Sequence, residues 1–108
     1  MGVRSRSKVT GAQYALAVTS GTVVTLTVPD AAMCAEIYVR TAAVVFTRDG
    51  TDPTATQGVQ ANANDIILLN SRDELDRFEV IAVSTTAALD VEYFTDVSGY
   101  APLIRIGA

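Results

Sequence analysis

The feature that most constrains the fold is a period of two in the apolar residues, repeated in short segments along the chain. In Thr22–Val28, for example, Val24, Leu26 and Val28 are separated by threonines. Successive side chains of a strand point to opposite faces, so this alternation predicts a strand with one buried and one solvated face. Val and Thr, which favour strands, are frequent throughout the chain. The pattern therefore predicts a β protein.

Turn signals suggest how these strands connect. Gln13–Val18 also alternates and precedes Thr22–Val28 closely, which favours a hairpin. Phe78–Val83 and Ala88–Thr95 favour a second hairpin for the same reason. The predicted turns are Ser20-Gly21 and Ser84–Ala87.

Between the hairpins, Glu36–Thr47 is predicted as one strand whose Val44–Phe46 part is buried on both faces. Asp65–Leu69 is predicted as a brief buried strand. The Ser-x-x-Glu spacing of Ser71 and Glu74 is that of a capping box, which begins a helix of one or two turns at most.

Together these segments predict an all-β fold, a single antiparallel β-sandwich of about seven strands with at most one short helical turn. Both an Ig-like and a jelly-roll-like sandwich fit the pattern. A chain of 108 residues is long enough for one domain. We expect this domain to span residues 12–108, including an apolar C-terminal segment, and to follow a flexible basic arm over residues 1–11.

Charge is unevenly placed. The net charge is −4, but Arg4, Arg6 and Lys8 lie in the first eight residues, which leaves five basic against twelve acidic residues in the rest. An acidic body repels nucleic acid, so we expect no nucleic-acid partner. No apolar run approaches the roughly 20 residues of a membrane span, and no signal peptide is recognisable, so no membrane partner is expected either.

Composition limits the chemistry available. The chain has no His and a single Cys, which removes the usual general base, most transition-metal ligands and any internal disulfide. Asp90 and Glu92 share one strand face, with Glu79 expected nearby, and could act as a carboxylate pair. Alternate acidic residues more simply mark the solvated side of a strand. Cys34 has no base near it in sequence.

The Asp49-Gly50-Thr51-Asp52 segment offers two carboxylates, but a calcium loop needs six or more oxygens. A turn held by aspartate side chains explains the same residues. Gly50 and Gly58 lack the following Lys-Ser/Thr of a phosphate loop. We therefore predict no catalytic residue, no metal site and no cofactor.

Several segments carry a resemblance to known proteins. The aromatic-Thr-x-Asp-Gly-x-x-Pro-Thr-Ala run, a following apolar strand and two later strands resemble small structural proteins from the virions of tailed bacteriophages. The part Thr47–Thr54 is also similar to strand-turn segments of Ig-like modules attached to chitin-degrading and other surface enzymes. The matching segments are Val45–Gly58, Ile66–Leu69, Leu75–Ala82 and Leu89–Phe94.

The phage resemblance implies a protein that is not an enzyme, made in the host bacterial cytoplasm and located in the virion. It implies a capsid decoration or cement protein, or a head, neck or tail component, which forms a homo-oligomer such as a trimer and contacts the major capsid protein or other virion proteins. We infer that both chain ends contact these partners, although the basic end also fits a solvated tail. The predicted docking residues are Arg4, Arg6, Lys8, Leu103, Ile104 and Ile106.

The Ig-like resemblance implies an alternative, a carbohydrate-binding or adhesion module. Such a module needs aromatic side chains on its surface to stack on sugar rings. The candidates are Tyr14, Tyr38, Tyr93 and Tyr100.

Overall fold

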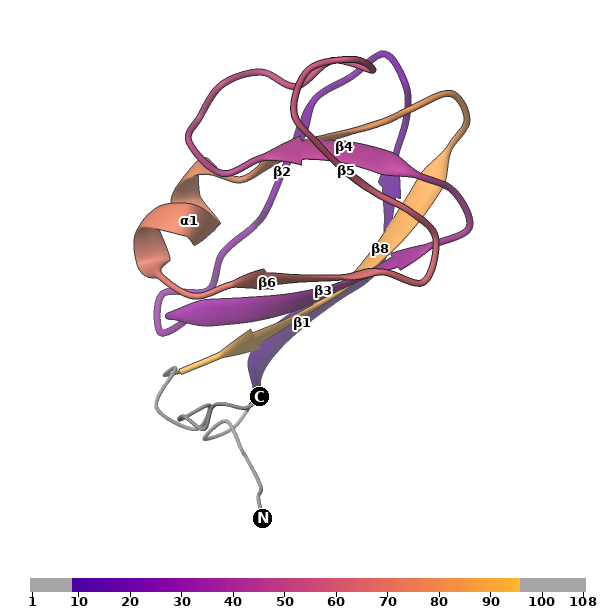
Figure 1. Cartoon of the computed structure of the whole chain (residues 1–108). Coiled ribbons are helices and arrows are strands. Elements are labelled where there is room, and N and C mark those ends of the chain that lie inside the picture. Colours follow the sequence, from indigo (N-terminus) through magenta and orange to yellow (C-terminus); the bar gives the residue numbers. More distant parts are fainter. Residues whose placement is uncertain (1–8, 96–108) are drawn as a thin grey trace, which may run out of the picture.

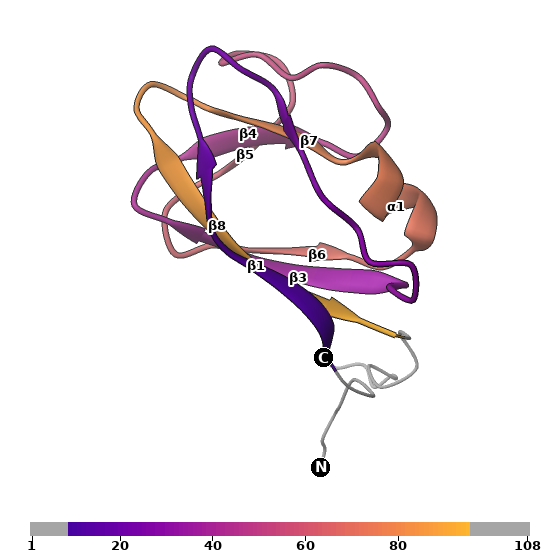
Figure 2. The same cartoon turned by 180° about the vertical axis from the view of Figure 1, so that it is seen from behind.

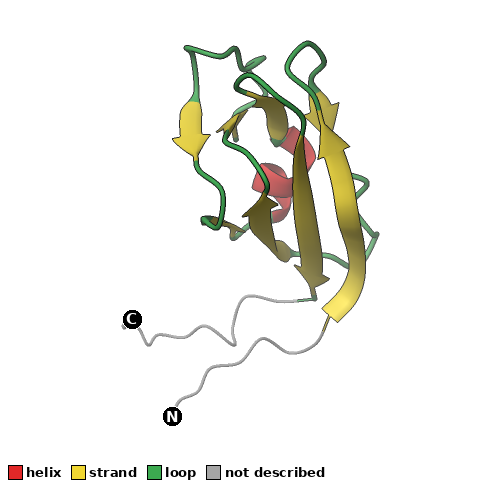
Figure 3. Cartoon of the chain, turned by 90° about the vertical axis from the view of Figure 1, so that its right-hand side faces the viewer, coloured by secondary structure: helices red, strands yellow, loops and turns green. Residues whose placement is uncertain are grey.

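Two four-stranded antiparallel sheets pack face to face in the computed structural model, which describes residues 9–95 (Figure 1). The first sheet has the order β1-β8-β3-β6 and the second β2-β7-β4-β5. Figure 3 shows these strands in yellow and a short helix, α1, in red. The predicted β-sandwich is confirmed, with eight strands in the described residues. The elements are β1 (Val9–Val18), β2 (Val24–Thr25), β3 (Cys34–Arg40), β4 (Val44–Thr47), β5 (Val59–Ala61), β6 (Ile66–Leu69), α1 (Arg72–Arg77), β7 (Glu79–Ala82) and β8 (Ala87–Phe94).

The strands pair as if one long antiparallel ribbon had been rolled up. The first strand pairs with the eighth, the second with the seventh, the third with the sixth and the fourth with the fifth. The roll is closed by two further antiparallel pairs, β3 with β8 and β4 with β7. This order is that of an eight-stranded jelly roll, so the structure decides between the two sandwich types.

Both predicted hairpins are wrong. β1 and β2 lie in different sheets, as do β7 and β8, so the segments between them cross from one sheet to the other (Figure 2). Val18 pairs with Ala87 and Val24 with Val80. Alternation identifies the buried face of each strand but carries no information about its neighbour, and in a rolled ribbon consecutive strands commonly belong to opposite sheets.

The predicted strand Glu36–Thr47 is also divided. β3 ends at Arg40 in the first sheet, and β4 begins at Val44 in the second. Thr41, between them, has a φ of 70°, which is uncommon for a β-branched residue, and no Gly or Asn in the sequence marks this corner. At the N-terminal side, β1 begins at Val9, so residues 9–11 of the predicted arm belong to the first sheet.

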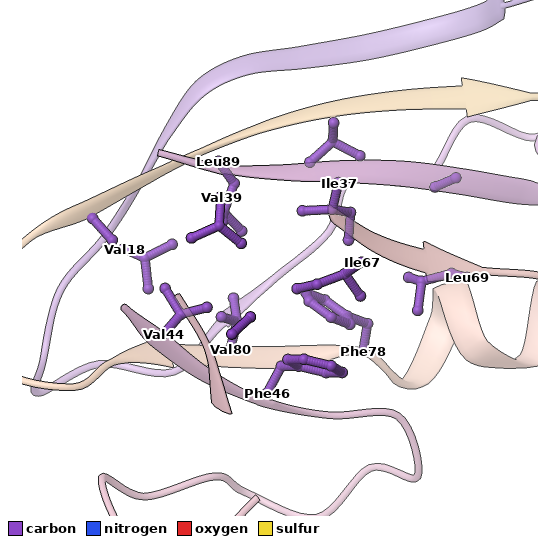
Figure 4. Close-up of a cluster of buried hydrophobic side chains, with 14 of the residues drawn as sticks. Val18, Ile37, Val39, Val44, Phe46, Ile67, Leu69, Phe78, Val80 and Leu89 are labelled. Atoms are coloured by element: carbon purple, nitrogen blue, oxygen red, sulfur yellow. The ribbon is translucent and has the colours of Figure 1, made fainter. Parts of the chain in front are cut away.

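The core lies between the sheets and includes the apolar faces of β3, β7 and β8 (Figure 4). In β1 the alternation does not hold throughout, because the register shifts between Gln13 and Leu16 and leaves Tyr14 exposed. Alternate residues of β8, from Leu89 to Tyr93, are fully buried. Phe46 of β4 and Phe78, just before β7, stack with ring centroids 5.6 Å apart and planes inclined by 29°. Offset aromatic pairs at this distance add to the stabilisation that burial provides.

Helix α1 closes one end of the sandwich between the two sheets (Figures 1 and 2). The Ser71 cap is confirmed, since Ser71 Oγ accepts from the Glu74 N–H at 3.2 Å. The return bond differs from that of a capping box: Glu74 Oε1 accepts from the N–H of Asn70 at 2.7 Å, one residue before the N-cap. Arg72 Nη1 donates to three backbone carbonyl oxygens of the segment that precedes β3. These bonds tie the helix to the first sheet. The three carbonyls belong to Pro29, Asp30 and Ala32.

The second sheet is covered on its outer face as well. Val45 and Ile81 have side chains on the face opposite the core, yet both are buried. The loop between β4 and β5 returns over this face at Gly58, where a Cβ atom would lie 2.6 Å from Val45 Cγ1 and 3.0 Å from the carbonyl oxygen of Phe46. This contact explains why Val44–Phe46 is buried on both faces, as predicted.

Gly58 therefore combines a close contact with a φ of +132°, which L side chains rarely adopt. We expect Gly58→Ala to destabilise the protein by about 1–3 kcal/mol, measured by urea unfolding. The matched control is Gly21→Ala, because a Cβ there meets nothing within 4 Å. Equal unfolding midpoints for the two variants would show that the loop is not packed on Val45.

Candidate interaction surface

Asp90 and Glu92, the carboxylates considered for acid–base chemistry, lie on the outer face of the first sheet. Asp90 accepts hydrogen bonds from the Ala15 N–H at 2.9 Å and from Arg40 Nη1. These donors, the Ala15 amide first, lower the pKa of the Asp90 carboxyl below its ordinary value. A carboxylate stabilised in its ionised form has no proton to donate at neutral pH, so Asp90 is unsuited to act as a general acid.

Two tyrosines engage the neighbouring glutamates on this face. The Tyr14 hydroxyl donates to Glu92 Oε2 at 2.9 Å, and the Tyr38 hydroxyl donates to Glu36 Oε1 at 2.8 Å. Glu36 and Glu92 are direct cross-strand partners, a placement in which like charges repel. The hydroxyl donors offset part of this repulsion, and the bond to Glu92 raises the pKa of Tyr14.

The four tyrosines do not form one aromatic surface. Tyr93 is fully buried, and burial raises the pKa of its hydroxyl to about 12. Tyr100 lies outside the described residues. Tyr14, with 63% of its surface exposed, and Tyr38 remain on the outer face of the first sheet.

Glu79 is not near Asp90 and Glu92, contrary to expectation, because β7 belongs to the second sheet. Its Oε1 atom is buried without a hydrogen-bond donor, and the carboxyl of Asp52 lies within hydrogen-bonding reach. Two carboxyls this close favour sharing a proton over ionising together. The hydrogen bond to Asp52, burial and the charges of Asp52 and Asp49 all raise the pKa of Glu79.

The other residues considered for metal or redox chemistry have structural roles. Asp49 Oδ1 accepts from the Thr51 N–H at 3.0 Å, which confirms the aspartate-held turn and lowers the pKa of Asp49. Cys34 is fully buried on β3. Within residues 9–95, no three His, Cys, Asp or Glu side chains gather where they could hold a metal ion.

Because the pKa of Glu79 is raised, the stability of the folded protein should depend on the protonation of this carboxyl. When the pKa of a carboxyl is higher in the folded than in the unfolded protein, the folded protein holds the proton more tightly. The free energy of unfolding then falls as the pH rises through the folded-state pKa. We expect Glu79→Gln to raise the urea midpoint at pH 7 and to leave it unchanged at about pH 3, where both states are protonated.

The control is Asp30→Asn, which alters an exposed carboxylate and should change stability by less than about 0.5 kcal/mol at either pH. Asp52→Asn should raise the midpoint in the same pH range as Glu79→Gln, because it removes the other carboxyl. If Glu79→Gln lowers the midpoint at pH 7, the two carboxyls do not repel one another.

An exposed apolar strip follows the side of the sandwich where β5 and β6 form the outermost strands of the two sheets. Val59 of β5 is 50% exposed, and Ile66 and Leu68 of β6 are 56% and 38% exposed. These three residues and their neighbours line a groove with a volume of about 490 Å³. We call this groove, together with the outer side of β6, the β5–β6 surface.

The lining of the groove is apolar along its floor and charged at its rim. Phe46, Ala61 and Ile67 belong to the buried core, so the groove reaches down to the interior of the sandwich. Arg48 and Asp65 are exposed at its rim. A second hollow, of about 370 Å³, adjoins the first and shares Phe46, Arg48 and Val59 with it.

Sequence reasoning missed this surface because Ile66–Leu69 is continuously apolar. Such a run indicates a strand buried on both faces, but β6 is the last strand of its sheet within the described residues, and only Ile67 and Leu69 are buried. The prediction of a fully buried strand is therefore wrong. The polar residues on either side of the run were the one available sign of an exposed position. The docking residues that the sequence did predict, Arg4, Arg6, Lys8, Leu103, Ile104 and Ile106, lie outside the described residues.

No protein-family model, no curated protein and no solved structure matches the chain. In the described part of the chain, no helix is long and apolar enough to cross a membrane.

Proposed function

We propose that the chain is a non-enzymatic structural protein of a tailed-phage virion, a capsid decoration or cement protein or a head or neck component, that assembles as a homo-oligomer. The observation that carries the assembly role is the β5–β6 surface, where Val59, Ile66 and Leu68 are exposed together beside a groove. Exposed apolar side chains grouped in this way are typical of protein interfaces.

The energetics of this surface favour association. Burying apolar area is worth about 25 cal/mol per Å², so covering Val59, Ile66 and Leu68 stabilises a complex in proportion to the area removed from water. The interior of β6 also lacks the charged residue or proline that commonly blocks unwanted pairing at a sheet edge.

The virion setting is supported by two weaker observations. Jelly rolls are common in viral capsid proteins, although they also occur in lectins and enzymes, so the fold gives an analogy only. The resemblance of Val45–Gly58 and the later strands to phage structural proteins points to the same setting. The carboxylates of Asp90 and Glu92 are engaged by Arg40 and Tyr14, which does not suit a reaction on this face.

The alternative function, carbohydrate binding, has one observation in its favour. Tyr14 is the most exposed of the large apolar side chains in the described residues, and it lies beside the carboxylate of Glu92. Glycan binding that is lost in Tyr14→Ala and retained in Val9→Ala, a change at another exposed residue of β1, would favour this function instead.

The proposed function predicts that the purified chain forms a defined oligomer. Sedimentation velocity over a concentration series should show one species heavier than the monomer, and antibodies against the chain should label intact virions of the phage that encodes it. A chain that stays monomeric at every concentration and is missing from the particles contradicts the proposal.

A further inference from the structure

The backbone of β6 has a free side as well as exposed side chains. Val39 bonds to Asn64 and Asp65, since its N–H donates to the Asp65 carbonyl and its carbonyl accepts from the Asn64 N–H. In an antiparallel ladder, every second residue directs its backbone N–H and C=O groups toward the neighbouring strand. Like Asp65, Ile67 and Leu69 therefore direct theirs toward β3. The N–H and C=O groups of Ile66 and Leu68 then point away from β3, where the described residues contain no further strand.

The other outermost strands are less suited to accept a partner. β1 has two irregularities in its register, and Ala15, within one of them, has a φ of 57°. β2 and β5 have only two and three residues. Bulges and short length are both devices that protect sheet edges. β6, with four apolar residues in regular register, is the edge best able to take an added strand.

We infer that β6 accepts the segment Leu103–Ile106 of a second copy of the chain, added as a further antiparallel strand. This inference rests on the proposed homo-oligomer and names the segment and the surface that join its subunits. Among the residues beyond Thr95, this segment has the apolar character that the groove requires. Pro102 just before it is tolerated at the start of an added strand.

The pattern of the segment matches the two sides of the β5–β6 surface. In a strand, Ile104 and Ile106 share one face, while Leu103 and Arg105 share the other. With the isoleucines over the groove, Arg105 lies on the outer face of the first sheet. The carboxylates of Glu36, Asp90 and Glu92 make that face acidic and attract Arg105. The same orientation therefore places the isoleucines on the apolar groove and the arginine on the acidic face.

The geometry favours a second copy over the same chain. β8 ends at the same end of the first sheet as β6, since Tyr93 and Leu69 both pair with Ala35. A strand formed by the chain's own C-terminal segment would first have to pass the ends of β3 and β6. That end holds α1 and the segment before β3, which Arg72 ties together. The seven residues 96–102 span at most about 25 Å, so β6 of the second copy must lie within that distance of the end of β8 in the first.

Disulfide trapping tests the contact directly. Ile66 lies on the outer face of the first sheet, the face that Leu103 and Arg105 share in this orientation. Ile66→Cys in one tagged chain should therefore form a mixed dimer on mild oxidation with Leu103→Cys or Arg105→Cys in a chain of different mass, since the native Cys34 is buried. The control replaces Ile66→Cys with Val9→Cys, on β1 at the opposite edge of the sheet and 46% exposed, and should give little product. Equal trapping by both acceptors overturns the inference.

A second measurement compares variants of the donor and the acceptor by sedimentation. Ile66→Thr with Leu68→Thr should weaken association at least about tenfold, and so should Ile104→Thr with Ile106→Thr. Because both pairs belong to one contact, combining them should weaken association little further. Val9→Thr with Met33→Thr, at exposed apolar positions away from the groove, should leave association unchanged. Circular dichroism checks that every variant is folded.

The outcomes separate this inference from the proposed function. If the chain forms oligomers that neither pair of variants weakens, the inference is wrong and the proposed function stands. If only the β6 variants weaken association, another surface of the second copy fills the groove, which also overturns the inference. If Ile66→Cys closes a disulfide with Leu103→Cys or Arg105→Cys of the same chain within a monomer, the chain's own segment occupies the groove, which overturns the inference. A chain that never associates and is missing from virions contradicts both proposals.

Discussion

The pairing of β1 with β8 is the contact on which the rest of the structure depends. It runs from Val9 opposite Phe94 to Val18 opposite Ala87 and joins the two ends of the described chain. All the other strand pairs join segments that lie between the first residue of β1 and the last residue of β8 in the sequence. The contacts that hold the sandwich together are therefore mostly distant in sequence, which is expected to make folding slow relative to a helical protein of the same size.

Closing the roll in this way also determines where the sheets end. β1 and β2 become outermost on one side of the sandwich, and β5 and β6 on the other. The first side is protected by the irregular register of β1 and the shortness of β2. On the second side, the regular apolar strand β6 borders a groove that reaches Phe46 of the core. The topology thus concentrates the capacity for association on one side of the molecule.

Charge limits where else two copies could meet. On the outer face of the first sheet, Glu36, Asp90 and Glu92 carry negative charge and are engaged by local donors. Two such faces repel one another, so nonspecific contact through this sheet is disfavoured. A buried carboxyl oxygen without a donor is instead Oε1 of Glu79, beside Asp52 of the loop that covers the second sheet. Repulsion there lowers the stability of the subunit and plays no part in the apolar contact.

The sequence by itself determined the β-sandwich class, the inward faces of β3, β7 and β8, and the cap of α1. These features depend on residues close in sequence: alternation sets which side chains of β8 are buried, and Ser71 lies three residues from Glu74. Tertiary structure alone decided the strand order, the corner at Thr41 and the exposure of Ile66 and Leu68. Strand pairing depends on which distant segments bury each other's apolar faces, and an apolar strand looks the same in sequence at the centre of a sheet and at its edge.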